Sequence, residues 1–272
     1  MTGAADRKVV LVTGASSGLG RATAALLAGQ GYRVFGTSRR PSAADLPGVE
    51  MLILDVRENT SVDEAVESVM RQTARIDVLI NNAGYLLSGA IEETSIEEAK
   101  AQFDTNFFGA VRMVRAVLPS MRAHGGGRII NIGSLAGLIG VPFEGFYSAS
   151  KHALEGYTAS LRHEVRPFGI CVSMVEPGFF RSELSGAKQA PALTAPDYEA
   201  VRGRAMASFE AAIAHGPDPA LVAATIARVV AAHAPRSHYR VGRDAVLVPA
   251  MMALLPQSVF ERGLRRRFRL DR

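Results

Sequence analysis

Several features that would direct the sequence toward particular classes of protein are missing or scarce. The 272 residues hold one cysteine, Cys171, so no internal disulfide can form, which agrees with a reducing compartment. No stretch reaches the roughly eighteen apolar residues that a membrane span needs, and the first residues, MTGAADRKVV, show no apolar segment after a basic start. We therefore expect a soluble, cytoplasmic protein.

Recognisable metal sites and reactive thiols are also missing. No His/Cys/Asp spacing suggests a metal centre, so we predict no metal. The apolar surroundings of Cys171 in GICVSMV favour a small buried residue over a nucleophile.

Positive charge is scarce outside one segment. The net charge is +5, but the segment from Glu261 onward, ERGLRRRFRLDR, holds six arginines and two acids and contributes +4, which leaves +1 for the other 260 residues. No basic stripe with interleaved aromatics crosses that part of the chain, so we do not expect nucleic acid as a partner.

What the sequence does have is a regular alternation of apolar β-rich runs with helical patterns. The runs are KVVLVTG, YRVFGTS, VEMLILDV, IDVLINNAG, GRIINIGS and GICVSMVEPG. This rhythm predicts βαβ units and a parallel sheet covered on both faces. After Pro177 it breaks into a mixed stretch, and a helix with Asp218 as its cap follows.

The first strand leads into a glycine-rich turn, VTGASSGLGRATAALLAGQG. Glycines at 14, 18 and 20 let backbone N–H groups and a helix N-terminus approach a pyrophosphate. The spacing is G-x-x-x-G-x-G, and alone it also fits a plain tight turn. Its place between the first strand and a helix favours an α/β, single-domain Rossmann-type doubly wound parallel sheet of about seven strands. We assign residues 1–256 to this domain, with a substrate lid near 183–215, and 257–272 to a C-terminal extension.

Three further segments complete a constellation: NNAG at 81–84, Ser134 in NIGS, and YSASK at 147–151. With 6 Tyr and 4 Lys, random placement gives about 0.09 Tyr-x-x-x-Lys pairs in the chain. Tyr147 and Lys151 lie one helical turn apart on one face. An ammonium at about 4 Å supplies on the order of 4 kcal/mol, enough to bring a phenol pKa from about 10 toward 7. Tyr147 is therefore a candidate proton donor or acceptor for a carbonyl or alcohol.

With these motifs, roughly residues 8–182 resemble the short-chain dehydrogenase/reductase family. The resemblance implies that Ser134 hydrogen-bonds the substrate oxygen and that Lys151 also holds the nicotinamide ribose. Asn106, in TNFFG, matches the position that links Lys151 to solvent through a water, although an Asn there also fits a hydrogen-bonded kink. Ser182 stands where the family often has threonine, in PGFFRS. The positions expected to bind the cofactor are Gly14, Ser16, Ser17, Gly18, Leu19, Gly20, Ser38, Arg39, Arg40, Asp55, Val56, Asn82, Ala83, Gly84, Tyr147, Lys151, Pro177, Gly178 and Ser182.

The end of the second strand, FGTSRRP, lacks the acid that holds the ribose 2′-OH of NAD in dinucleotide folds. It carries Arg39 and Arg40 instead, and an arginine can pair with a 2′-phosphate. We predict NADP(H) over NAD(H), with Arg39 as the preferred contact and Ser17 and Ser38 as hydroxyl donors.

The substrate is less well defined. Apolar residues around the motifs, among them Val141, Phe143, Phe179 and Phe180, favour a bulky apolar carbonyl or alcohol, although about half of such residues belong to the core. The segment from Gly140 to Gly169 also resembles the subgroup of 17β-hydroxysteroid and retinol dehydrogenases.

The C-terminal extension departs from the family. Phe260, Leu264 and Phe268 recur every four residues opposite arginines, as in a basic amphipathic helix. We expect it to pack on its own body or on a neighbouring subunit, with an anionic membrane surface as the alternative. The family resemblance also implies a homodimer or homotetramer.

Two functions fit these observations. The first is an NADP(H)-dependent oxidoreductase that interconverts a carbonyl and an alcohol, with Tyr147 as acid and base. The second is a non-catalytic NADP-binding redox sensor on the same fold. The presence of Ser134, Tyr147 and Lys151 together favours the first.

Overall fold

Seven parallel strands form the central sheet of the computed structural model, which describes residues 7–41, 46–181 and 188–271. Their order across the sheet is β3-β2-β1-β4-β6-β7-β9, and every neighbouring pair is parallel. This confirms the predicted doubly wound sheet. The strands are β1 (Val9–Val12), β2 (Arg33–Ser38), β3 (Val49–Ile53), β4 (Val78–Asn81), β6 (Gly127–Ile132), β7 (Ile170–Pro177) and β9 (His238–Val241).

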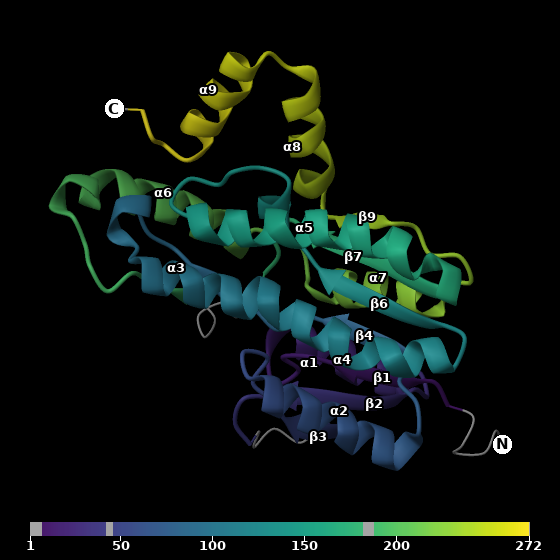
Figure 1. The fold of residues 1–272 in the computed structure, drawn as a ribbon. Helices are drawn as coiled ribbons and strands as arrows, with labels where there is room; N and C mark the ends of the chain where they lie inside the picture. Colours follow the sequence, from purple (N-terminus) through teal and green to yellow (C-terminus); the bar gives the residue numbers. More distant parts are fainter. Residues whose placement is uncertain (1–6, 42–45, 182–187, 272) are drawn as a thin grey trace.

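Helices cover both faces of this sheet (Figure 1). Alternate strand residues point to opposite faces, so Leu11 packs with α2 (Asn59–Thr73), α4 (Gly109–Ala123) and α5 (Gly145–Val165). Its neighbour Val10 packs instead with α1 (Gly18–Gly29) and α7 (Ala220–Ala231). Both residues are fully buried. The strands are apolar throughout because each is buried on both sides.

Most of the remaining short elements follow the carboxyl ends of strands, whereas η5 (Arg166–Phe168) leads into the amino end of β7. The chain passes from α3 (Ile96–Phe103) through a π-helical turn, η3 (Asp104–Phe108), directly into α4. The short strands β5 (Leu86–Leu87) and β8 (Lys188–Gln189) pair in parallel and join the segment after β4 to the segment after β7. The short helical turns are η2 (Ile91–Glu93), η4 (Leu135–Gly137) and η5.

Within the predicted mixed stretch and lid, the structure shows a long helix, α6 (Pro196–Ala214). Its buried side chains are Ala205, Ser208 and Phe209, too few to give a continuous apolar stripe that sequence periodicity reveals. The first part of the lid, 183–187, lies outside the described residues. At the next helix, the predicted cap is confirmed in part, because Asp218 accepts the N–H of Ala220 at 2.8 Å while α7 starts after Pro219.

The C-terminal segment forms a helical hairpin of α8 (Arg243–Leu254) and α9 (Gln257–Arg267), which rises beside α6 in Figure 1. The three residues predicted to form the apolar face of the extension, Phe260, Leu264 and Phe268, pack against a cluster of the body that includes Leu135 and Phe209. Phe268 is buried, and Arg204 donates to the carbonyl of Arg269 at 2.9 Å. The extension therefore packs on the body of its own chain, which is one of the arrangements expected from the sequence.

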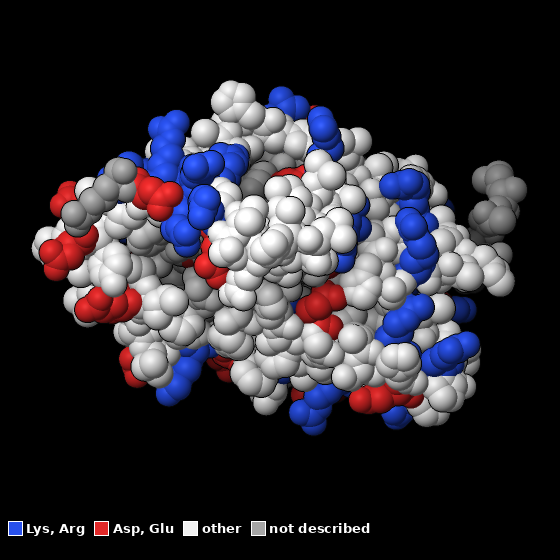
Figure 2. Space-filling model, turned by 90° about the horizontal axis from the view of Figure 1, so that it is seen from above, with Lys and Arg blue, Asp and Glu red and all other residues white. Residues whose placement is uncertain are grey.

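A different apolar surface of this hairpin is exposed. Leu247, Met251, Leu254 and Val259 are each about half exposed or more, and Figure 2 shows an uncharged surface beside a group of blue cationic side chains. Within the described parts of the chain, no helix is long and apolar enough to span a bilayer. Contact of the hairpin with a membrane surface stays a prediction.

Candidate active site

A cavity of about 1270 Å³ opens along the carboxyl ends of β1, β2, β4, β6 and β7. Parallel strands bring the loops that follow them to one edge of the sheet, where doubly wound folds bind their ligands. Of the predicted residues, the cavity is lined by Gly14, Ser16, Ser17, Gly18, Leu19, Gly20, Ser38, Arg39, Asp55, Val56, Asn82, Ala83, Gly84, Ser134, Val141, Tyr147, Lys151, Pro177, Gly178, Phe179 and Phe180.

The glycine-rich turn is tight and conformationally strained for other residues. Gly14 has φ +66° and Gly18 has φ +51°, both in the left-handed region. At Gly20 a Cβ would lie 2.1 Å from the Gly14 carbonyl oxygen. Ser17 caps α1 through its backbone and makes no side-chain cap hydrogen bond, so the first N–H groups of the helix are available to an anion. The turn therefore fits the pyrophosphate of a dinucleotide.

Replacing Gly20 with alanine should test this turn. The added methyl group must displace the Gly14 carbonyl, and overpacking of this kind costs about 1–3 kcal/mol. We expect the Kd for NADPH, measured by fluorescence titration, to rise at least about tenfold. Gly29→Ala in the same helix is the matched control, because its added Cβ meets no atom within 4 Å outside the backbone of its own helix and its chain neighbours. Equal affinity in the two variants would contradict a role for the turn geometry.

Asn82 and Thr13 connect the turn to the next strand. The Asn82 side-chain amide donates to the carbonyls of Thr13 and Gly14 at 3.0 and 3.1 Å. In return, the Thr13 hydroxyl accepts the N–H groups of Asn82 and Ala83, each at 3.0 Å. These reciprocal hydrogen bonds hold the glycine turn against the segment that follows β4, so Asn82 has a structural role in the site.

At the other end of the cavity, Arg39 and Arg40 differ in their position relative to the cavity. Arg39 lines the cavity, whereas Arg40 is exposed and does not line it. The Ser38 hydroxyl donates to the Arg40 carbonyl at 2.5 Å, which fixes the turn between them. Of the two predicted phosphate contacts, Arg39 is therefore the better placed.

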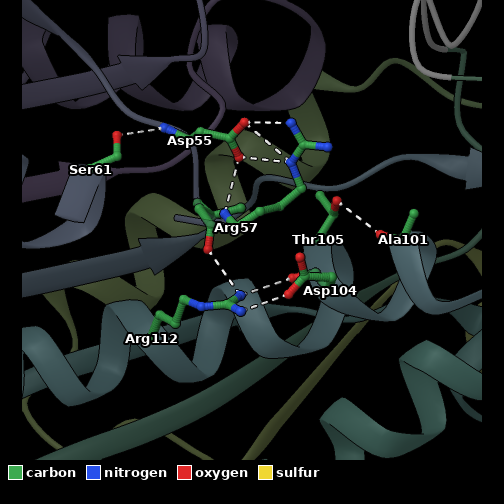
Figure 3. Close-up of polar contacts among 8 residues, drawn as sticks. Asp55, Arg57, Ser61, Ala101, Asp104, Thr105 and Arg112 are labelled. Atoms are coloured by element: carbon green, nitrogen blue, oxygen red, sulfur yellow. Dashed lines mark hydrogen bonds and ion pairs between the residues drawn. The ribbon is translucent and has the colours of Figure 1, made fainter. Parts of the chain in front are cut away.

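Asp55 lies in the same part of the cavity, and its charge is compensated by Arg57, a residue that the motifs did not single out (Figure 3). Arg57 Nη2 and Nε lie 2.6 and 3.0 Å from the Asp55 carboxylate oxygens. This hydrogen-bonded guanidinium holds the pKa of Asp55 below its ordinary value. On the next residue, the Val56 carbonyl accepts from Arg112 of α4 at 3.3 Å. A phosphate near Arg39 therefore meets a neutralised carboxylate.

Ser134, Tyr147 and Lys151 meet where β6 and α5 face the cavity. The Ser134 hydroxyl accepts the N–H of Ala136 at 3.1 Å, which fixes its position at the start of η4. It also lies close enough to the Tyr147 phenol to lower the pKa of that group. Lys151 is buried, and its Nζ donates to the Ile132 carbonyl at 2.8 Å and lies 5.8 Å from the centre of the Tyr147 ring.

The expectation that Lys151 brings the phenol pKa toward 7 is wrong for the protein's own groups. Burial raises the pKa of Tyr147 to about 12, with a further increase from Glu144, and burial lowers the pKa of Lys151 to about 8. Desolvation is the largest cause of both shifts, and the Lys151 ammonium donates to the Ile132 carbonyl. Tyr147 is thus held protonated at neutral pH, as a proton donor must be.

Asn106 is in η3, is buried and does not line the cavity. Its Oδ1 accepts the N–H of Tyr85 and its Nδ2 donates to the Tyr85 carbonyl, both at 3.0 Å, while Nδ2 also reaches Ser150 Oγ at 3.2 Å. The side chain therefore joins the helix to the NNAG loop at a π-helical turn, as the kink interpretation predicts. A proton relay through this residue stays a prediction.

The segment after β7 is held by a residue that the sequence motifs do not include, Asp244 of α8. Its carboxylate accepts the N–H of Phe179 at 2.6 Å, and a Cβ on Gly178 would lie 2.1 Å from it. Gly178 is therefore required for the carboxylate to approach. Ser182, the expected threonine equivalent, lies outside the described residues.

The apolar end of the cavity contains three of the four predicted substrate residues. Phe143 is the exception: its ring packs edge-on against Tyr198 of α6, with centroids 6.4 Å apart, and does not line the cavity. Its backbone is left-handed, with φ +62°, and the following residue, Glu144, lines the cavity in its place. Further apolar wall residues missed by the sequence come from distant segments and include Leu86, Phe209 and Ile213.

One group of potential metal ligands is brought together by the fold, from segments that sequence spacing does not connect. Ligand atoms of Glu155, Glu176 and His238 lie within 4.8 Å of one another. They already interact, because His238 pairs with Glu155, and Arg240 Nε lies 3.7 Å from the Glu176 carboxylate. The group lies where the carboxyl-terminal half of β7 pairs with β9, and it does not line the cavity.

A glycine turn on a helix N-terminus, joined by one cavity to a serine, a tyrosine and a lysine beneath an apolar wall, is typical of nicotinamide-dependent oxidoreductases. A family model described as short chain dehydrogenase matches residues 8–192. The chain belongs to the short-chain dehydrogenase/reductase family, whose members are oxidoreductases.

Known relatives are similar over nearly the whole chain. A 3-ketodihydrosphingosine reductase from Bacteroides thetaiotaomicron is 42% identical over 261 residues, which cover 95% of this chain and 97% of the relative. A crystal structure of a short-chain dehydrogenase from Streptomyces avermitilis has 36% identity and a TM-score of 0.83, covering 96% of this chain and 98% of that one. A metagenomic short-chain oxidoreductase in complex with NADP has 26% identity and a TM-score of 0.67, covering 86% and 96%.

Proposed function

We propose that this protein is an NADP(H)-dependent oxidoreductase that interconverts a carbonyl and an alcohol on a long, largely apolar substrate, with reduction as the main direction. One observation carries the proposal: Ser134 and Tyr147 lie in the same cavity as the glycine turn and as the apolar wall of Leu86, Phe209 and Ile213. The likeness to a 3-ketodihydrosphingosine reductase supports a long-chain ketone as substrate.

The chemistry divides between the cofactor and the chain. A reduced nicotinamide supplies the hydride when it is bound. Ser134 and Tyr147 hydrogen-bond the carbonyl oxygen, where negative charge develops as the hydride arrives. Tyr147 then donates its proton to that oxygen. Its raised pKa keeps the proton on the phenol until the oxygen becomes basic enough to take it.

Lys151 has two duties in this proposal. Its ammonium, fixed by the Ile132 carbonyl at 2.8 Å, stabilises the phenolate that remains after proton transfer. It would also hold the ribose beside the nicotinamide. The lowered pKa of about 8 lets this lysine pass on a proton near neutral pH, which allows the phenol to be protonated again.

The preference for NADP(H) rests on the end of β2. Arg39 lines the cavity there, the described residues up to Pro41 include no acid after Ser38, and Asp55 is paired with Arg57. A cationic end of the cavity favours a 2′-phosphate over a hydroxyl. The NADP complex of the metagenomic neighbour supports the same choice.

Absorbance of NADPH gives the direct test. We expect the full chain to oxidise NADPH with 3-ketodihydrosphingosine at a kcat/KM at least about tenfold above that for short ketones, since each buried methylene contributes about 0.8 kcal/mol. Steroid and retinoid carbonyls complete the panel and test the finer subgroup resemblance. Absence of turnover with every carbonyl, while NADPH still binds, would favour the redox sensor.

Two further parts of the proposal concern the state of the protein. We propose a cytoplasmic enzyme, in keeping with the one cysteine in the sequence. We also propose a homodimer or homotetramer. Support for it comes from a hollow of about 520 Å³ between α3, η3 and the start of α5, lined by Ile96, Phe103 and Phe108, of which Ile96 and Phe108 are about half exposed or more.

A further inference from the structure

Glu144 is a buried carboxyl group in the wall of the substrate end of the cavity. Its residue is 2% exposed, and it lines the same cavity as Ser134 and Tyr147. The backbone around it is fixed: its N–H donates to the Val141 carbonyl at 3.1 Å, and its carbonyl accepts from Ser148 at 2.8 Å. The backbone that carries this side chain is therefore fixed, three residues before the candidate proton donor in the sequence.

Within the described chain, this carboxyl group has no hydrogen-bond partner for its buried Oε1. Glu93, which is just as buried, shows the usual arrangement: it accepts N–H groups from Ala90 and Ala195, both at 2.9 Å, and pairs with Arg202. Burial of an unpaired carboxyl group costs several kcal/mol in stability. A carboxyl group that is buried without a partner next to the candidate catalytic residues indicates that a bound ligand supplies the missing partner.

The charged and titratable groups around Glu144 come from three elements. A negative charge on Glu144 raises the pKa of Tyr147 of α5. Lys188 of β8 attracts the Glu144 carboxylate, but the Lys188 ammonium lies 3.0 Å from Glu210 of α6 and pairs with that residue. Burial outweighs the attraction and raises the pKa of Glu144 to about 8. The carboxyl group thus lacks a cation of its own and is close enough to the phenol to influence it.

This position defines the ligand group. The carbonyl oxygen of a substrate lies at Ser134 and Tyr147, so a group that meets Glu144 must be attached close to the carbonyl carbon. An ammonium on the carbon next to the carbonyl meets this requirement and carries the charge that a carboxylate binds. 3-Ketodihydrosphingosine, the ketone in the name of the 42% identical relative, is such an α-amino ketone.

We propose that Glu144 is a specificity-determining residue that binds the ammonium group of an α-amino ketone substrate. This inference rests on the proposed function and names the substrate class more closely. Glu144 takes no part in hydride or proton transfer to the carbonyl, and the amine is unchanged by the reaction. The rest of the substrate chain runs along Phe209 and Ile213.

Binding also involves a proton. A carboxyl group that is largely protonated below pH 8 must ionise to hold an ammonium, so the affinity for the amino ketone should increase as the pH rises toward 8. It should fall again once the free amine loses its own proton. A matched ketone without the amine should lack this dependence.

The test compares wild type and Glu144→Gln on two long-chain ketones, 3-ketodihydrosphingosine and the same ketone lacking the amine. We expect the variant to lose about tenfold or more in kcat/KM for the amino ketone, mainly through KM, and to change less than about threefold for the other ketone. Its pH profile for the amino ketone should become that of the matched ketone. Glu144→Asp should recover part of the preference.

Two controls separate this role from a structural one. NADPH titration confirms that the variant is folded and binds cofactor, and Glu199→Gln, which makes the same change at an exposed residue of α6 outside the cavity, should leave the preference unchanged. Equal losses with both ketones would overturn the inference and make Glu144 a positioning residue for Tyr147. A wild type that prefers the amine-free ketone would overturn it while keeping the proposed function. Absence of turnover with either ketone would overturn both.

Discussion

Replacing Tyr147 with phenylalanine should lower kcat by about two to four orders of magnitude, since general acid catalysis by a positioned side chain contributes about 10²–10⁴-fold. The variant keeps the ring that packs in the cavity wall and removes only the phenol oxygen. Ser134 can still hydrogen-bond the carbonyl, but no proton reaches the developing alkoxide. The measurement is single-turnover oxidation of NADPH, with the Kd for NADPH determined in parallel.

Tyr157→Phe is the matched control for this experiment. Tyr157 lies on the same helix, burial also raises its pKa to about 12, and its ring packs against Phe107 at 5.9 Å, away from the cavity. Its loss should leave kcat within about threefold, because it touches none of the reacting groups. If Tyr147→Phe retained a tenth of the wild-type kcat with unchanged NADPH affinity, another group would have to supply the proton.

Changing Arg39 to aspartate should shift the cofactor preference from NADPH toward NADH by about a hundredfold in the ratio of kcat/KM values. Loss of a charge-assisted pair with the 2′-phosphate contributes about 1.5–3 kcal/mol, and the new carboxylate both repels that phosphate and accepts from a ribose hydroxyl. Initial rates with each cofactor at fixed ketone concentration give the ratio directly.

Arg40→Asp makes the same charge change one residue further along. Because Arg40 does not line the cavity, we expect its ratio to change by less than about fivefold, through screened long-range charge alone. A reversed order, with the larger shift from Arg40, would assign the phosphate contact to that residue. Unchanged ratios in both variants would reject the proposed preference for NADP(H).

The parts of this site that the sequence reveals are those carried by short local motifs. The glycine turn follows a strand and opens a helix, and Tyr147 and Lys151 are one helical turn apart, so their geometry is fixed by secondary structure alone. The fold class follows from the alternation of apolar runs with helical patterns, because βαβ connections leave few arrangements open.

The parts that sequence reasoning missed depend on tertiary structure. The left-handed backbone at Phe143 turns its ring toward α6 and places Glu144 in the cavity wall. A positive φ at a phenylalanine cannot be predicted from the sequence PFEGFY. Asp244 reaches the segment after β7 from a helix 65 residues further along the chain. The pKa of Tyr147 depends on burial that no spacing reveals.

The packing of the C-terminal hairpin also imposes an order on folding. Phe268 is buried against the cluster that contains Leu135 and Ala136, the two residues directly after Ser134. During synthesis, β1 and β2 can pair early, but α1 packs on α7 and β4 pairs with β6, so completion of the sheet needs segments much further along the chain. The wall behind Ser134 can close only after residue 268 has left the ribosome. The glycine turn at the end of β1 should therefore form before the wall behind Ser134 is closed.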